Sequence, residues 1–254
     1  MRLLRTLVTL IFIASATCNI NNTALKREKI VGGQYRAIYQ APYTAQLLHA
    51  GAVICGAAII TNQWLVSAAH CFEESYDMTV LTGSTYRSKG QRHIIDKAII
   101  HRNYNRVTND NDICLIKLKK PMVFDNRQKS VPLSTTRAKV GQQLVISGYG
   151  LEGERRPVSP FLKIAVVPVV DHRVCAFKYI RDPITDNMFC AGIGETDACL
   201  GDSGGPGVIN GELAGVVSSG MECGSRIYPG VYTRIDKYFN WIVNYTGNKL
   251  GLQG

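Results

Sequence analysis

Beyond its first 29 residues, the chain alternates short apolar runs with polar segments rich in Gly, Asn, Asp and Pro. Runs that contain many β-branched and aromatic residues and are bounded by such turn residues are typical of β-strands. No internal repeat or long linker interrupts this pattern. It predicts an all-β protein with strands at 53–60, 64–67, 94–100, 113–118, 143–147, 162–170, 213–218 and 230–234.

The last apolar segment has a helical period instead of a strand period. From Asp236 onwards, the large side chains of Tyr238, Trp241, Ile242 and Tyr245 recur every three or four residues. This spacing places them on one face of an α-helix. We therefore expect a C-terminal helix after the strands, in one compact unit of a size that is common for barrel proteins.

The first apolar run differs from all the others. Two arginines, Arg2 and Arg5, precede an apolar stretch from Leu7 to Ala14, and small residues follow at 14–16. This is the pattern of a secretory signal peptide. The stretch is shorter than the roughly 20 apolar residues that a transmembrane helix needs. We predict a signal peptide at residues 1–16 and a secreted, extracellular protein without a membrane partner.

Composition narrows the range of partners. The formal net charge is +10 at pH 7, but the basic residues form no nucleic-acid-binding motif, so we interpret them as a solvated surface. The chain has five histidines and neither a Cys-x-x-Cys nor a His-Glu-x-x-His motif. Because metal sites need such spacings, we expect no metal, no cofactor and no nucleic-acid partner.

Residues 201–206 read Gly-Asp-Ser-Gly-Gly-Pro and place Ser203 among residues that let another backbone approach closely. Glycines adopt backbone angles that other residues resist, and such a loop can turn two N–H groups toward the position of an oxyanion. Those donors would belong to Gly201 and Ser203. Taken alone, the motif is also compatible with an ordinary turn.

A serine nucleophile needs a base within reach and a third group that orients the base. His70 lies in an Ala-Ala-His-Cys motif, and Asp112 precedes the apolar run 113–118. Either residue alone would more often be structural. Together with Ser203 they follow the order His, Asp, Ser, which differs from the subtilisin and α/β-hydrolase orders. From about Ile30 to its C-terminal region, the chain resembles the trypsin-like members of the chymotrypsin family of serine proteases.

The resemblance implies a fold and a mechanism. The fold would be two six-stranded antiparallel β-barrels with a C-terminal α-helix, the first barrel at about 30–124 and the second at about 125–254. The catalytic residues would be His70, Asp112 and Ser203 in the cleft between the barrels. Ser203 would attack the scissile carbonyl, His70 would transfer the proton, and Asp112 would hold the imidazole, with an acyl-enzyme as intermediate.

Substrate selection is also implied by the resemblance. Asp197 corresponds to the carboxylate at the floor of the S1 pocket, and Gly220 and Gly230 to its open walls. Such a pocket selects Arg or Lys before the scissile bond, because an apolar side chain would leave the buried carboxylate unpaired. Ser218 would support Asp112 and begin the strand that pairs with the substrate backbone.

Two positions depart from the family pattern near this pocket. Ser219 stands where most trypsin-like enzymes have a tryptophan, and Leu200 replaces a common polar residue at the pocket rim. A hydroxymethyl group in place of an indole removes a large apolar platform. We therefore expect contacts with the substrate residues P2 to P4 to be weaker or differently shaped.

The segment at 17–29 matches an activation propeptide, so the protease domain would span residues 30–254. In the family, cleavage before the Ile-Val-Gly-Gly sequence, here after Lys29, frees the amino group of Ile30. That amino group would pair with Asp202, and the buried ion pair would organise both the oxyanion donors and the specificity pocket. Because breaking a buried pair typically costs about 3 to 5 kcal/mol, the uncut zymogen would be inactive.

The eight cysteines suit an oxidising compartment. The resemblance implies the disulfides Cys55–Cys71, Cys175–Cys190 and Cys199–Cys223, a connectivity that sequence alone does not give. Cys18 lies in the propeptide. Cys114 lies within an apolar strand, where we expect a buried, inert thiol.

Two classes of function are compatible with these features. The first is a secreted serine endopeptidase, made as a zymogen, which cleaves after Arg or Lys. The alternative is a non-catalytic binding or regulatory protein on the same fold, since fold alone does not fix function. Three intact triad positions favour the enzyme. Its partners would be protein or peptide substrates, an activating protease and protein protease inhibitors, and the protein would be a monomer.

Overall fold

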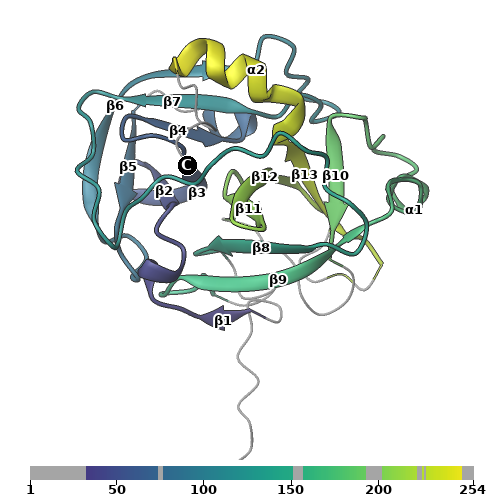
Figure 1. Ribbon diagram of the computed structural model, residues 1–254, viewed down its shortest axis with the longest axis horizontal. Coiled ribbons are helices and arrows are strands. Elements are labelled where there is room, and N and C mark those ends of the chain that lie inside the picture. The colour runs from purple at the N-terminus through teal and green to yellow at the C-terminus, as the bar shows by residue number, and fades with distance from the viewer. Residues whose placement is uncertain are drawn as a thin grey trace, which may run out of the picture.

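The computed structural model describes residues 33–73, 77–150, 157–192, 202–221, 225 and 227–247. Two β-barrels lie against one another, and a helix at the C-terminal end crosses the first of them (Figure 1). The predicted signal peptide, the propeptide and the residues Lys29 and Ile30 lie outside the described residues.

The first barrel is a closed sheet of six antiparallel strands in the order β2-β3-β4-β7-β6-β5. Consecutive strands pair with one another except β4 and β5: β4 pairs with β7, and β5 pairs with β2 to close the barrel. The strands are β2 (Thr44–His49), β3 (Ala52–Ile59), β4 (Trp64–Ser67), β5 (Met78–Thr82), β6 (Gln91–Ile100) and β7 (Cys114–Leu118).

The second barrel is built in the same way, and pairing of β8 with β9 closes the order β9-β10-β13-β12-β11-β8. Its β11–β12 hairpin turns at Asn210 and Gly211, both of which have positive φ, as a two-residue hairpin turn requires. The strands are β8 (Gln143–Gly148), β9 (Lys163–Val170), β10 (Met188–Ala191), β11 (Pro206–Ile209), β12 (Glu212–Ser219) and β13 (Gly230–Arg234).

Each end of the described chain contacts the barrel that is farther along the sequence from it. The short strand β1 (Gln34–Tyr35) pairs with β9 of the second barrel. Helix α2 (Ile235–Thr246) packs against β12 of its own barrel and buries Ile235, Tyr238 and Ile242 in a core that also contains first-barrel strands. His101, just after β6, contacts the rings of Tyr238 and Trp241 at centroid distances of 5.1 Å each. These two crossed ends hold the barrels together.

The expected fold class is confirmed: the chain forms two six-stranded antiparallel barrels with a C-terminal helix. All eight predicted strands are present within a few residues of their expected ends. The pattern did not reveal β1, β2, β5, β10, β11, the short helices η1 (Ile38–Gln40) and η2 (Ala69–Phe72), or α1 (His172–Lys178). In the described part of the chain, no helix combines the length and the apolar character that a membrane span requires.

Candidate active site

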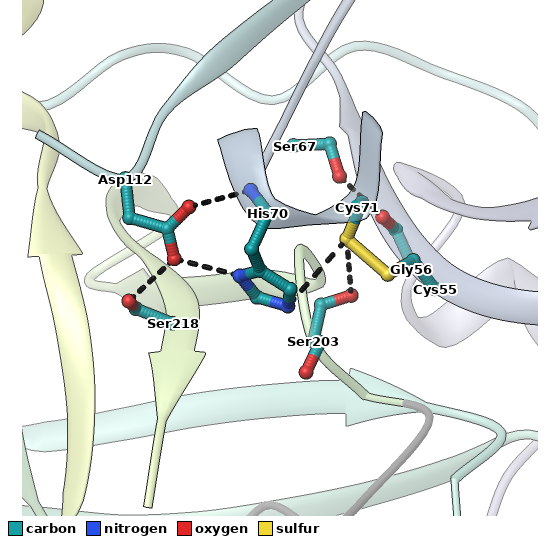
Figure 2. Close-up of a disulfide and its surroundings, with 8 residues drawn as sticks. All are labelled: Cys55, Gly56, Ser67, His70, Cys71, Asp112, Ser203 and Ser218. Atoms are coloured by element: carbon teal, nitrogen blue, oxygen red, sulfur yellow. Dashed lines mark hydrogen bonds and ion pairs between the residues drawn. A yellow bond between two sulfur atoms is a disulfide. The ribbon is translucent and has the colours of Figure 1, made fainter. Parts of the chain in front are cut away.

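Three distant parts of the sequence meet between the barrels. His70 lies on η2, directly after β4; Asp112 lies two residues before β7; Ser203 lies in the loop before β11. Figure 2 shows the imidazole between the other two side chains, with Asp112 on the Nδ1 side and Ser203 on the Nε2 side. The structure thus brings together the three residues that the sequence singles out as a triad.

The contact between His70 and Asp112 is made twice. His70 Nδ1 lies 2.8 Å from Asp112 Oδ2, and the His70 backbone N–H donates to Asp112 Oδ1 over 3.0 Å. Because one carboxylate binds both the ring and the backbone of the same residue, the imidazole has little freedom to rotate. Nε2 is therefore directed toward Ser203 (Figure 2).

Asp112 is fully buried, and the second barrel supplies its remaining partners. Ser218 Oγ, on β12, donates to Asp112 Oδ2 over 2.6 Å. Thr233 Oγ1, on β13, donates to the Asp112 carbonyl oxygen over 2.8 Å. A buried carboxylate is stable only when hydrogen bonds or charges replace its lost water, and here donors from both barrels do so.

The pKa of His70 is raised above its ordinary value. Burial, the largest influence, disfavours the imidazolium and by itself lowers this pKa. The hydrogen bond to Asp112 and the negative charges of Asp112 and Glu73 act in the opposite direction and together outweigh burial. The site therefore stabilises a protonated His70, the state that a general base reaches after it has accepted a proton.

Glu73 is a site residue that the sequence analysis missed. Its carboxylate accepts a hydrogen bond from Tyr104 over 2.8 Å and forms an ion pair with Arg106 at 2.9 Å. Tyr104 and Arg106 belong to the β6–β7 loop, which also carries Asp112. No local motif reveals this cluster, because it forms only when that loop folds back onto η2.

The loop that carries Ser203 is held by both barrels. Gly56, on β3, donates its N–H to the Ser203 carbonyl oxygen over 2.7 Å, and Gly204 donates to Val217, on β12, over 2.7 Å. Gly204 has a φ of +79°, and a Cβ there would overlap Ser67 Oγ and lie 2.6 Å from the Gly56 carbonyl oxygen. Only glycine fits this position, so the glycine after Ser203 is a steric requirement of the site.

No hydrogen bond joins Ser203 Oγ to His70 Nε2 among the bonds of the described residues. The two side chains nevertheless face the same space (Figure 2). Catalytic hydrogen bonds are often long or poorly aligned in unliganded sites and tighten when substrate binds. A longer contact in the unliganded site is therefore compatible with the roles predicted for Ser203 and His70.

A disulfide lies beside His70. Cys55 and Cys71 are bonded, with Cα atoms 6.3 Å apart, and the Cys71 sulfur lies 3.8 Å from His70 Nε2. The bond fastens η2 to β3, which also binds the Ser203 loop. The sulfur and nitrogen atoms of Cys55, His70 and Cys71 are grouped closely enough to resemble a metal site. Disulfide sulfurs are not thiolates, however, so the grouping reflects the crosslink.

The other cysteines follow the expectations where the structure describes them. Cys175 on α1 is bonded to Cys190 on β10. Cys114 is a buried free thiol, and burial raises its pKa, which disfavours the reactive thiolate. Cys18, Cys199 and Cys223 lie outside the described residues.

The residues implied in activation and specificity are described only in part. Asp202 is 5% exposed and accepts a hydrogen bond from the Gly150 N–H over 2.9 Å. Ser218 lies near the end of β12, Gly220 directly follows that strand, and Gly230 begins β13. A Cβ placed on Gly220 would meet nothing within 4 Å, so this wall is open. Asp197, Leu200 and Gly201 lie outside the described residues.

Comparison with known proteins agrees with this geometry. The trypsin family model matches residues 30–242. The chain is 39% identical over 219 residues to trypsin V-A of Rattus norvegicus, which covers 85% of this chain and 88% of the rat protein. It is 41% identical over 222 residues to a trypsin of Xenopus laevis, covering 85% of this chain and 89% of that protein.

A solved structure is similar throughout the fold. Neuropsin, a serine protease expressed in the limbic system of mouse brain, superposes with a TM-score of 0.79 at 32% sequence identity. The match covers 84% of this chain and 98% of neuropsin. With the family match spanning both barrels, this chain belongs to the trypsin family of serine endopeptidases.

Proposed function

We propose that this chain is a secreted zymogen that, once cleaved after Lys29, hydrolyses peptide bonds following Arg or Lys. The observation that carries the proposal is the hydrogen-bonded series Ser218–Asp112–His70, with Ser203 on the far side of the imidazole. This arrangement suits proton transfer from a serine hydroxyl during acyl transfer.

The proposed reaction has two halves. Ser203 Oγ attacks the scissile carbonyl carbon while His70 Nε2 takes the hydroxyl proton, and the protonated His70 then gives that proton to the leaving amine. Water attacks the resulting acyl-enzyme in the second half, again with His70 as base. The N–H groups of Gly201 and Ser203 are the proposed oxyanion donors, each worth about 100 to 1,000-fold in rate.

Specificity and activation complete the proposal. Asp197 would bind the Arg or Lys side chain between the open positions Gly220 and Gly230. The new amino group of Ile30 would pair with Asp202, whose buried position beside Ser203 couples activation to the nucleophile loop. The trypsin names of its relatives support protein substrates. We further propose an activating protease and protein protease inhibitors as partners. We propose an extracellular monomer.

The test is a cleavage assay on the zymogen and on the protein cut after Lys29. We would measure kcat/KM on peptide amides that differ only in the residue before the scissile bond. We expect Arg and Lys substrates to exceed Leu and Phe substrates by about 100-fold or more, because several kcal/mol separate a paired from an unpaired buried charge.

Ser203→Ala is the matched control for contaminating proteases and should lose turnover. The uncut zymogen should also be inactive. Correctly cut, folded protein without turnover would contradict the enzyme proposal. Turnover with a preference for Leu or Phe would contradict only the proposed pocket.

A further inference from the structure

A cavity of about 520 Å³ lies at the end of the second barrel where β9 leads into α1. It is lined by residues 136–140, residues 169–172 and Phe189, none of which belongs to the candidate active site. Figure 1 shows α1 at the outer edge of the second barrel, away from the region where the two barrels meet. The volume is within the range of about 300–1,000 Å³ that small-molecule sites usually have.

The inner wall of the cavity is apolar and held in place by the barrel core. Val169 and Phe189, which are 4% and 5% exposed, belong to that core, and Ala138 packs against it. The Phe189 ring is also stacked on Tyr232, with the ring centroids 5.3 Å apart. Val140, on the solvent side of the cavity, is 64% exposed. An apolar ligand would therefore extend a packed core and remove apolar surface from water.

The exposed part of the lining carries more positive than negative charge. Arg137 and Lys139 are both exposed, and within the described parts of the chain neither forms an ion pair. Asp171 is the one acidic residue among the described lining residues, and its Oδ1 accepts hydrogen bonds from the Arg173 and Val174 N–H groups. Two cations without a protein counterion attract an anionic group on a ligand.

His172 adds a hydrogen-bonding atom to the cavity. Its Nδ1 is buried but makes no hydrogen bond to any described residue. Buried polar atoms in folded proteins almost always have a partner, so an exception needs an explanation. In one of the two neutral tautomers Nδ1 carries the proton and can donate it to an oxygen atom. A carboxylate oxygen in the cavity would be the missing acceptor.

We propose that this cavity is a binding site for a small amphipathic anion, an aromatic or aliphatic carboxylate. The apolar body of the ligand lies against Val169 and Phe189. Its carboxylate lies beside Arg137 and Lys139 and accepts a hydrogen bond from His172 Nδ1. The site goes beyond the proposed function and does not depend on it, because no residue of the triad or of the S1 pocket takes part.

Isothermal titration calorimetry on the uncut chain tests the class of ligand. Naphthalene-2-carboxylate and octanoate are each titrated beside a neutral match, naphthalene-2-carboxamide and octanamide. We expect at least one carboxylate to bind at one site per chain. Its affinity should exceed that of its amide by about tenfold or more, because charge-assisted hydrogen bonds are the stronger ones.

Methyl NMR signals locate the bound ligand. The signals of Val140 and Val169 should shift saturably with the carboxylate, and that of Val123, which is exposed and lies outside the cavity, should not. Val140→Trp should abolish binding, because the indole takes up the ligand's space. Val123→Trp adds the same indole outside the cavity and should keep the wild-type affinity.

A second set of variants tests the basic residues. Arg137→Gln combined with Lys139→Gln should bring the carboxylate-to-amide affinity ratio to near one, and His172→Phe should lower it. Lys119→Gln combined with Lys120→Gln removes two exposed positive charges outside the cavity and should leave the ratio unchanged.

Failure of both carboxylates to bind would overturn the proposal, and so would equal affinity for each carboxylate and its amide. Binding that leaves Val140 and Val169 unshifted, or that folded Val140→Trp retains in full, would place the ligand elsewhere and also overturn it. Every measurement uses the uncut chain. A failed cleavage assay would therefore contradict the proposed function without affecting this result.

Discussion

Two carboxylates act on His70, and they differ in how they are held. Asp112 is buried and touches the imidazole at 2.8 Å, so it fixes both the orientation and the charge preference of the ring. Glu73 is partly exposed and is balanced by Arg106 and Tyr104. At the scale of single residues, Asp112 therefore provides the geometry and the larger electrostatic effect, and Glu73 adds a smaller electrostatic effect.

Glu73→Gln is expected to move the acid limb of the kcat/KM profile to lower pH. As the proposed base, His70 would work only when neutral, so activity should rise as the pH passes its pKa. Removing a negative charge destabilises the imidazolium and lowers this pKa. Arg106→Ala should have the opposite effect, because it removes the positive charge that offsets Glu73.

Asp96→Asn is the matched control, since Asp96 also pairs with a basic residue, Lys117, on the first barrel but is absent from the charges that act on His70. Profiles should be recorded from about pH 5 to 9. An unchanged limb in both Glu73→Gln and Arg106→Ala would show that the Glu73 cluster has no electrostatic role.

At the scale of elements, two glycines with similar backbone angles allow the cost of backbone strain to be measured apart from the cost of steric overlap. Gly204 has a φ of +79° and Gly211 a φ of +84°, but a Cβ would collide with Ser67 and Gly56 only at Gly204. Gly211→Ala should therefore cost about 1–2 kcal/mol of backbone strain. Gly204→Ala should cost a further 1–3 kcal/mol or so for overpacking.

Thermal unfolding and kcat/KM together test this comparison. Gly204→Ala should lower both Tm and activity, because the Ser203 loop must shift, whereas Gly211→Ala should lower Tm alone. Equal stability losses with full activity in both variants would mean that the loop tolerates displacement without affecting the nucleophile.

Sequence patterning located eight strands, including the fully buried β4 and β13, but missed other elements that are short or interrupted by polar residues. Strand β2 carries Gln46, which is polar yet only 1% exposed. Its burial is tolerated because the Ser88 N–H donates a hydrogen bond to its Oε1. Strand β11 is four residues long and begins with Pro206. Helix α1 has seven residues and begins at the N-cap Asp171. Such elements depend on tertiary partners that a local pattern does not contain.

At the scale of the whole molecule, sequence reasoning brought His70, Asp112 and Ser203 together but not the residues that support them. The triad has local motifs and a chain order that can be compared with a family. Glu73 with Arg106, and Asp110 with Thr185, are pairs between distant loops.

Ile242→Ala should destabilise the whole molecule by about 2–5 kcal/mol, the usual cost of a large-to-small change in a fully buried position. Asn240→Ala, exposed on the same helix, should change stability by no more than about 0.5 kcal/mol. Denaturant unfolding followed by Trp fluorescence and by far-UV circular dichroism should shift coincidently. Separate transitions would show that α2 stabilises only one barrel.

The crossed ends would affect the outcome of self-cleavage, in which one copy of a protease cuts another. A nick in the connector between β7 and β8 would leave β1 on the N-terminal fragment but docked on the second barrel, and α2 on the C-terminal fragment but docked on the first. Each fragment would thus remain bound to the other without a covalent link. Autolysis at that connector would leave a noncovalent complex in which the site residues of the two barrels still face each other.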